Sequence, residues 1–171
     1  MGRKPAPRKT DAATKPARAP ARVSLPHLAI VVGEYNTEVT TAMEKRAVQR
    51  AHDLGYEPDP IVRVLGSYDL PFAVDLALQR TDVIAAVAIG AVVTGETGHD
   101  ELIATATAKT LQELMLLHGK PIGLAITGPK QTYAQAEARL DRASAAVEAV
   151  DMMLRAAVAA RKERRRPGRR R

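Results

Sequence analysis

The sequence has no cysteine and no tryptophan, and only five of its 171 residues are aromatic. Without cysteine the chain can form no disulfide, thiolate metal site or cysteine nucleophile, which fits a reducing compartment such as the cytoplasm. The longest apolar run, residues 83–93, is interrupted by Gly90 and falls short of the roughly 20 residues that span a bilayer. The basic N-terminus lacks the apolar segment of a secretory signal. We therefore expect a cytoplasmic protein with no membrane segment.

Acidic residues are scarce at both ends of the chain. Residues 1–22 hold seven Lys/Arg and one Asp, a net charge of +6, and residues 161–171 hold eight Lys/Arg and one Glu, a net charge of +7. Residues 23–160 hold 11 basic and 17 acidic residues, a net charge of −6. Because the two ends have almost no large apolar side chains, they bury too little surface to offset the entropy of ordering. We expect disordered basic tails at 1–22 and 161–171 around one folded domain, 23–160.

Strand-like and helix-like segments alternate four times within that domain. The strand-like runs are HLAIVVG at 27–33, DPIVRVLG at 59–66, VIAAVAIGAVV at 83–93 and KPIGLAITG at 120–128. Helical patterns follow them, from an N-cap at Thr37 to about Gly55, over 72–80, from about Asp100 to His118, and on to about Ala160 with a break near Leu140–Ser144. This alternation predicts a single-domain α/β protein, a three-layer α/β/α sandwich with a four-stranded parallel sheet of the flavodoxin-like type.

Polar and aromatic residues follow the first three predicted strands. Parallel sheets bind ligands at the carboxyl ends of their strands, where these loops gather. Tyr35 and Tyr68 lie in two of the loops and can stack on a planar ligand ring, although a tyrosine can also simply close a loop against the sheet. His99, in the third loop, has a side chain suited to general acid/base chemistry near neutral pH.

The glycine-rich segment Gly95-Glu96-Thr97 precedes a predicted helix start, where backbone amides attract phosphate. Its spacing matches neither a dinucleotide fingerprint nor a P-loop, so an ordinary surface turn is the alternative. Arg139 can supply the cation that a phosphate site needs, or can be a solvated helix arginine. We expect no metal at residues 99–101, because adjacent side chains point in different directions and no second histidine follows one helical turn later.

In these segments the sequence resembles the lumazine synthase family, over about residues 27–155. The resemblance rests on the pair Tyr35-Asn36, on GSYDLP at 66–71, on GAVVTGETGHDE at 90–101 and on AITGP at 125–129, and it is closest to the archaeal-type branch. It implies condensation of 5-amino-6-ribitylaminouracil with 3,4-dihydroxy-2-butanone 4-phosphate to 6,7-dimethyl-8-ribityllumazine in riboflavin biosynthesis. It also implies that these small-molecule substrates react without a cofactor or metal.

The same resemblance implies a role for individual residues. Tyr35 stacks on the pyrimidine, and the pyrimidine and ribityl contacts are completed by Asn36, Ser67, Tyr68, Asp69 (a glutamate in the family), Val92, Val93 and, from a neighbouring subunit, Leu124. Gly95, Glu96, Thr97 and Arg139 bind the phosphate, and His99 is the proton-transfer residue. The assembly implied is a homo-oligomer, a pentamer or a 60-subunit shell, with sites at subunit interfaces.

Some features depart from that pattern. Thr94 stands where many bacterial members have arginine, Asp100 stands where they have an aromatic residue, and the lysine-bearing glycine segment after Arg139 is shortened. The basic tails lie outside the pattern altogether. Their charge predicts weak, salt-sensitive binding of nucleic acid or another polyanion, with mere solubilisation as the alternative. Two other functions compete with the enzyme: a flavin- or nucleotide-binding module on a similar sheet, and a polyanion-binding protein acting through its tails.

Overall fold

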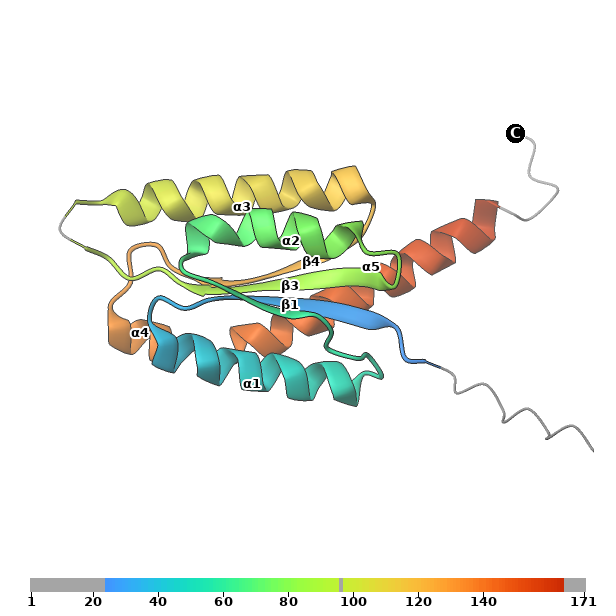
Figure 1. Ribbon diagram of the computed structural model, residues 1–171, viewed down its shortest axis with the longest axis horizontal. Helices are drawn as coiled ribbons and strands as arrows, with labels where there is room; N and C mark the ends of the chain where they lie inside the picture. Colours follow the sequence, from blue (N-terminus) through green and yellow to red (C-terminus); the bar gives the residue numbers. More distant parts are fainter. Residues whose placement is uncertain (1–23, 96, 165–171) are drawn as a thin grey trace, which may run out of the picture.

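The computed structural model describes residues 24–95 and 97–164 (Figure 1). Four strands form one parallel sheet in the order β2-β1-β3-β4, with bounds β1 His27–Gly33, β2 Ile61–Val64, β3 Val83–Ala91 and β4 Ile122–Thr127. The helices are α1 Thr37–Asp53, α2 Leu70–Gln79, α3 His99–His118, α4 Tyr133–Glu137 and α5 Arg142–Arg164, with a short 3-10 helix η1 at Ser67–Asp69. The predicted single-domain parallel α/β fold is confirmed.

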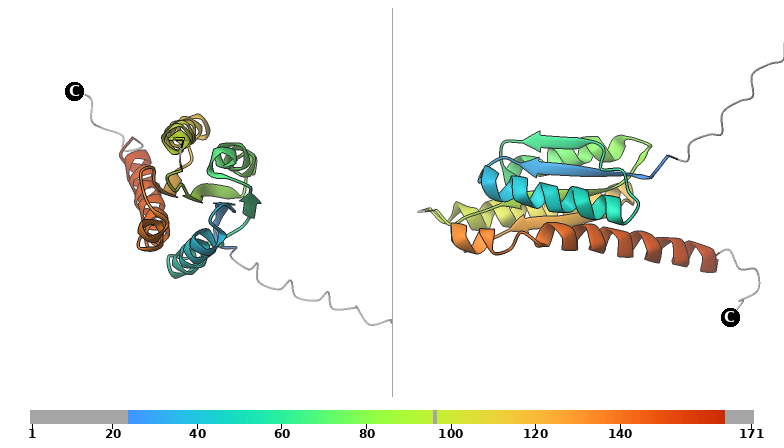
Figure 2. Two further views of the ribbon diagram at one scale, coloured as in Figure 1. Left: turned by 90° about the vertical axis from the view of Figure 1, so that its left-hand side faces the viewer. Right: turned by 90° about the horizontal axis from the view of Figure 1, so that it is seen from below.

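Helices cover both faces of the sheet, α1 and α5 on one and α2 and α3 on the other (Figure 2). The alternation of side chains along a strand produces the two cores. In β1, Leu28, Ile30 and Val32 face α1 and α5, while Ala29 and Val31 face α2 and α3, and all five are buried. The strands therefore read as continuous apolar runs, as expected for a sheet buried on both faces.

The start of α1 differs from the predicted N-cap at Thr37. Thr37 is the first helical residue, and the N-cap position belongs to Asn36, whose φ of 58° is in the left-handed region. Asparagine tolerates this conformation better than a β-branched threonine does. The other end of the helix is as predicted, because Gly55, with a φ of 83°, follows the C-cap Leu54.

The last helix is longer than the sequence predicted. The break lies at 138–141, and α5 then continues to Arg164, four residues beyond the expected end at Ala160. Its alanine-rich run favours helix, and basic side chains near a helix C-terminus interact well with the helix dipole. Residues 161–164, assigned to a tail, are therefore helical. Residues 1–23 and 165–171 lie outside the described residues, so the division into tails and domain stays a prediction.

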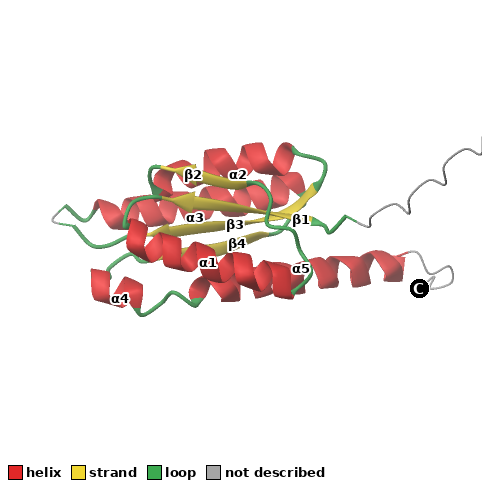
Figure 3. Cartoon of the chain, turned by 60° about the horizontal axis from the view of Figure 1, so that its bottom comes forward, coloured by secondary structure: helices red, strands yellow, loops and turns green. Residues whose placement is uncertain are grey.

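The two ends of the sheet have different neighbours. The loops after β1, β2 and β3 gather at the carboxyl ends of the strands, whereas β1 begins and α5 ends on the opposite side (Figures 1 and 3). In the part of the chain that the structure describes, no helix has both the length and the apolar character needed to cross a membrane.

Candidate active site

An open pocket of about 410 Å³ lies at the carboxyl ends of β1 and β3. Its lining residues are Tyr35, Asn36, Ser67, Ala91, Val92, Val93, Thr94, His99 and Ile103. Six of these nine belong to the predicted site. The volume falls within the range of small-ligand sites, and the walls combine apolar and polar side chains as such sites do.

Tyr35 presents an exposed ring on a fixed backbone. The amides of Glu34 and Tyr35 donate to the carbonyls of Val64 and Leu65 at 2.8 and 2.9 Å, which continues the pairing of β1 with β2 beyond the strand ends. The ring lies against Gly66, where a Cβ would come within 3.0 Å of two ring carbons. With 61% of Tyr35 exposed, one edge of the ring has a backbone support while the residue remains open to a ligand.

Asn36 and Ser67 join the loops to the end of β3. The Asn36 amide donates to the Ala91 carbonyl at 2.9 Å, so this side chain links β1 to β3 instead of capping α1. Ser67 is buried, and its Oγ lies so close to Gly90 that a Cβ there would come within 2.5 Å of it. The Ser67 carbonyl accepts a hydrogen bond from Thr107 of α3 at 3.1 Å. Both residues are thereby held at the pocket wall.

Tyr68 and Asp69 do not line this pocket. Tyr68 is 69% exposed, and Asp69 accepts a hydrogen bond from the amide of Gly66 at 2.9 Å. The Asp69 carboxylate therefore closes the turn that supports Tyr35. A direct contact of Asp69 with a ribityl hydroxyl would need its second oxygen or a side-chain rotation.

The segment before α3 brings a hydroxyl and an imidazole together. Thr97 Oγ1 and His99 Nδ1 share a hydrogen bond of 2.7 Å, and Gly95 lies beside the His99 ring. His99 is the first residue of α3, one residue earlier than the predicted helix start. Because Nδ1 is engaged by Thr97, the ring is oriented and this hydrogen bond does not involve Nε2. Glu96 lies outside the described residues.

Thr94 and Asp100, two of the departures from the bacterial pattern, contact each other. Asp100 is 2% exposed, and its Oδ2 accepts from Thr94 Oγ1 at 3.2 Å and from the Lys130 amide at 3.1 Å. The hydrogen bond from the Lys130 amide is the main cause that holds the pKa of Asp100 below its usual range. An ionised carboxylate thus ties the two ends of the segment 94–100 together and joins them to the loop after β4.

Arg139 and Leu124 lie elsewhere in the single chain. Arg139, after α4, donates from Nη1 to Gln131 Oε1 at 2.8 Å and does not line the pocket. Leu124 is 49% exposed on the edge strand β4, where it borders a different groove with Met115 and Ile122. The structure of one chain therefore does not bring these two predicted residues to Tyr35.

Sequence reasoning missed three lining residues, Ala91, Thr94 and Ile103. Ile103 had a usable signal, because it lies one helical turn after His99 and so shares its face of α3. Thr94 could have been found as the first polar residue after β3. Ala91 lines the pocket at the strand end itself, and its small apolar side chain gave no signal.

A separate group of acidic residues and a histidine lies at the opposite end of the sheet. Within the described ranges, His27, Asp59 and Asp82 are the side chains with a spacing that could hold a metal ion. Arg80 Nη2 lies 2.7 Å from a carboxylate oxygen of each aspartate, and its hydrogen bond lowers the pKa of Asp82 to about 2. A guanidinium between the carboxylates repels a cation, so this arrangement is an ion-pair network.

Comparison with known proteins identifies the chain's family. The family model for 6,7-dimethyl-8-ribityllumazine synthase matches residues 26–161. The chain belongs to this family. A 6,7-dimethyl-8-ribityllumazine synthase of Staphylothermus marinus is 47% identical over 128 residues, which are 74% of this chain and 85% of the relative. Similar relatives from Methanopyrus kandleri (44%, covering 75% and 91%) and Archaeoglobus fulgidus (43%, covering 71% and 85%) carry the same name.

Family membership makes the chain an enzyme, a transferase of riboflavin biosynthesis. It also implies small-molecule substrates and assembly of several copies of the chain. This function is favoured over a stand-alone flavin- or nucleotide-binding module and over a protein that acts through its basic tails. The archaeal-type resemblance agrees with these relatives.

Proposed function

We propose that the pocket at Tyr35 condenses 5-amino-6-ribitylaminouracil with 3,4-dihydroxy-2-butanone 4-phosphate to 6,7-dimethyl-8-ribityllumazine. The observation that carries the proposal is the meeting, in one pocket of about 410 Å³, of an exposed aromatic ring, two anchored polar side chains and an oriented histidine. These are the groups that a flat polar ring, a polyol and a proton-transfer reaction require.

The pyrimidine would stack on the exposed ring of Tyr35, which Gly66 supports at one edge. Val92 and Val93 would form the apolar wall beside the ring, and Asn36 and Ser67 would contact its polar edge and the ribityl chain. Tyr68 would reach the ribityl chain from outside the described pocket wall. The main role of Asp69 would be to hold the Gly66 turn through its hydrogen bond to the Gly66 amide. Contact with a ribityl hydroxyl would be its second role.

The phosphate would bind at the segment 95–97, with Thr97 and backbone amides as donors next to the start of α3. The reaction then needs proton transfers rather than redox chemistry: the ring amine and the butanone carbonyl form a Schiff base with loss of water, phosphate is eliminated, and the second ring closes with loss of a second water. His99 would move the protons, with its ring oriented by Thr97. Positioning two reactive substrates side by side supplies much of the remaining rate.

Two predicted residues would come from a neighbouring copy. Leu124 is half exposed at the β4 edge and Arg139 is exposed after α4, and neither lines the pocket of its own chain. In a homo-oligomer, a pentamer or a shell of 60 subunits, they would cover the substrates and bind the phosphate of an adjacent site. The sites would then lie at subunit interfaces.

A cytoplasmic location and weak polyanion binding by the basic ends complete the proposal. The absence of cysteine supports the cytoplasmic location. The charges of +6 over residues 1–22 and +7 over residues 161–171 support the binding of polyanions.

The proposal is tested by mixing the protein with both substrates and following the fluorescent lumazine. We expect its formation above the uncatalysed background, with the same rate after treatment with EDTA. A yield equal to the background would contradict the activity, and a loss of rate with EDTA would contradict a metal-free reaction.

A further inference from the structure

Gln131 is a buried amide in the loop between β4 and α4. It is 2% exposed, although glutamine is usually a surface residue. Its Nε2 donates to Thr127 Oγ1 at 2.8 Å and to the Val92 carbonyl at 3.2 Å, and its Oε1 accepts from Arg139 Nη1 at 2.8 Å. Each polar atom of this side chain therefore has a partner.

The orientation of this amide is set by its surroundings. The Val92 carbonyl can only accept, and the guanidinium of Arg139 can only donate. With the amide reversed, two N–H groups would face the guanidinium and an oxygen would face the carbonyl. The observed orientation is thus the one that satisfies both neighbours, and it leaves Oε1 as a fixed acceptor for Arg139.

The backbone of Gln131 is also fixed within its own chain. Its backbone carbonyl accepts from the amide of Thr94 at 2.9 Å. Arg139 itself is exposed, and a long exposed arginine loses rotamer freedom when it binds a ligand. An arginine already held at one nitrogen loses less freedom and keeps its remaining donors for an anion.

We propose that Gln131 is a positioning residue that holds the guanidinium of Arg139 for the phosphate of the substrate. This inference rests on the proposed function, because it takes Arg139 as the phosphate arginine. Gln131 does not touch the substrate. It acts through Arg139, and its loss is therefore felt in phosphate recognition and not in recognition of the pyrimidine.

The test is Gln131→Met, which keeps the length of the side chain and removes its hydrogen bonds. We expect the KM for the butanone phosphate, and the inhibition constant of inorganic phosphate, to rise about three- to tenfold, the size of effect typical of one lost hydrogen bond. The KM for the pyrimidine should change by less than about twofold. Thr127→Val, which removes one anchor of the Gln131 amide, should shift the same constants in the same direction by less.

A double-mutant cycle separates positioning from a general loss of structure. If Gln131 acts through Arg139, then Gln131→Met in an Arg139→Ala background should cause no further rise in the KM for the butanone phosphate. Gln135→Met is the matched control, because Gln135 is an exposed glutamine of the same connection that bonds Thr132. We expect it to leave the ratio of the two KM values unchanged.

Equal changes in both KM values, or effects of Gln131→Met and Arg139→Ala that simply add, would overturn the inference. If Gln131→Met does not fold, Thr127→Val in the same cycle decides the question. Failure of the proposed function is seen separately, because the unmodified protein would then form no lumazine.

Discussion

His99 combines two properties that its side chain alone does not give, a place on the pocket wall and a bond that fixes its ring. The bond is the one to Thr97, and the place follows from its position as the first residue of α3. We expect His99→Ala to lower kcat by about 10²-fold or less, because general acid/base catalysis contributes on this order while substrate positioning remains. Steady-state kinetics with both substrates measures this. Loss of all activity above the background rate would contradict the assigned role, and so would an unchanged kcat.

Asp100 predicts a pH dependence of stability. Its hydrogen bonds to Lys130 and Thr94 favour the carboxylate, so its pKa is lower in the folded state than in the unfolded one. The stabilisation is then present above the ordinary aspartate pKa and is lost as the pH falls through the lowered pKa. We expect Asp100→Asn to unfold at a lower temperature than the unmodified protein at pH 7, with a gap that narrows in acid. A gap independent of pH between 7 and 3 would contradict this.

Single residues of the pocket could be predicted where a polar or aromatic side chain lies in the connection between a strand and the next helix, or at its end, as for Tyr35, Asn36 and His99. Positions set by contacts distant in sequence could not. Gln131 looks like a surface residue of a loop, but besides the nearby Thr127 and Arg139 it bonds the carbonyl of Val92, 39 residues earlier, and that contact forms only in the fold.

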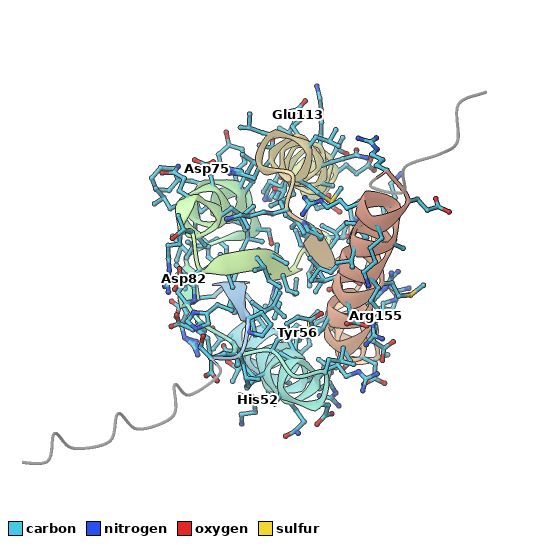
Figure 4. All side chains as sticks on the ribbon, turned by 90° about the vertical axis from the view of Figure 1, so that its right-hand side faces the viewer. His52, Tyr56, Asp75, Asp82, Glu113 and Arg155 are labelled. Carbon is cyan, nitrogen blue, oxygen red and sulfur yellow. The ribbon has the colours of Figure 1, made fainter. Side chains whose placement is uncertain are left out.

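At the level of helices and strands, α1 and α5 are joined across one face of the sheet by a buried tyrosine. Tyr56 lies between the two helices, and its hydroxyl donates to Asp151 at 2.8 Å, while Arg155 donates to the same carboxylate at 2.7 Å (Figure 4). The pKa of Tyr56 is raised to about 12, mainly by burial and then by the hydrogen bond to Asp151. The hydroxyl therefore stays protonated well beyond the range of an exposed tyrosine.

Tyr56→Phe should destabilise the protein by about 1 kcal/mol, the typical net value of one hydrogen bond, since the aromatic packing is kept. Urea unfolding of both forms measures this. Because the pKa is raised in the folded state, the contribution of Tyr56 is complete below pH 10 and is lost as the pH rises from 10 to 12. The two forms should become equally stable at that alkaline end, and a difference that instead grows with pH would contradict the assignment.

The elements themselves followed from the sequence more closely than their ends did. Apolar runs of strand length gave all four strands. The central strands β1 and β3 are buried along almost their whole length, whereas the edge strands β2 and β4 keep an apolar run although some of their side chains are exposed. The end of α5 did not follow, because composition marks residues 161–164 as tail while helix propensity carries the helix through them.

For the whole molecule, the two edges of the sheet expose different apolar surfaces. Leu65 and Phe72, near the β2 edge, are 62% and 70% exposed, and Leu124 on the β4 edge is 49% exposed. Two unlike surfaces on opposite edges favour a head-to-tail contact between copies, which closes into a ring when the rotation permits. This arrangement would bring the Leu124 of one copy toward the Tyr35 pocket of the next.

Leu124→Asp should therefore weaken both assembly and activity, because it places a charge on an apolar contact that also covers the substrates. Sedimentation velocity coupled to the lumazine assay measures both properties on the same sample. Asp141→Ala is the control, because this exposed residue pairs with Arg46 of α1 and is not part of the proposed site. A dissociated subunit that keeps full activity would contradict a site shared between copies.

The basic ends are joined to the domain on the side that is remote from the pocket, since β1 begins and α5 ends at the amino ends of the strands (Figures 1 and 2). A chain of residues 24–164 keeps every described element and loses twelve basic residues and one acidic one. It should make lumazine at the rate of the full chain and lose RNA binding at low salt, because each phosphate contact adds to a salt-dependent electrostatic term. Binding of the full chain should weaken steeply from 50 to 200 mM salt, roughly by the tens- to thousands-fold expected of several phosphate contacts.

Equal RNA binding by both forms would locate the interaction on the folded domain. Lost synthesis in a truncated chain that still folds and assembles would mean that the chemistry depends on residues outside the pocket proposed above.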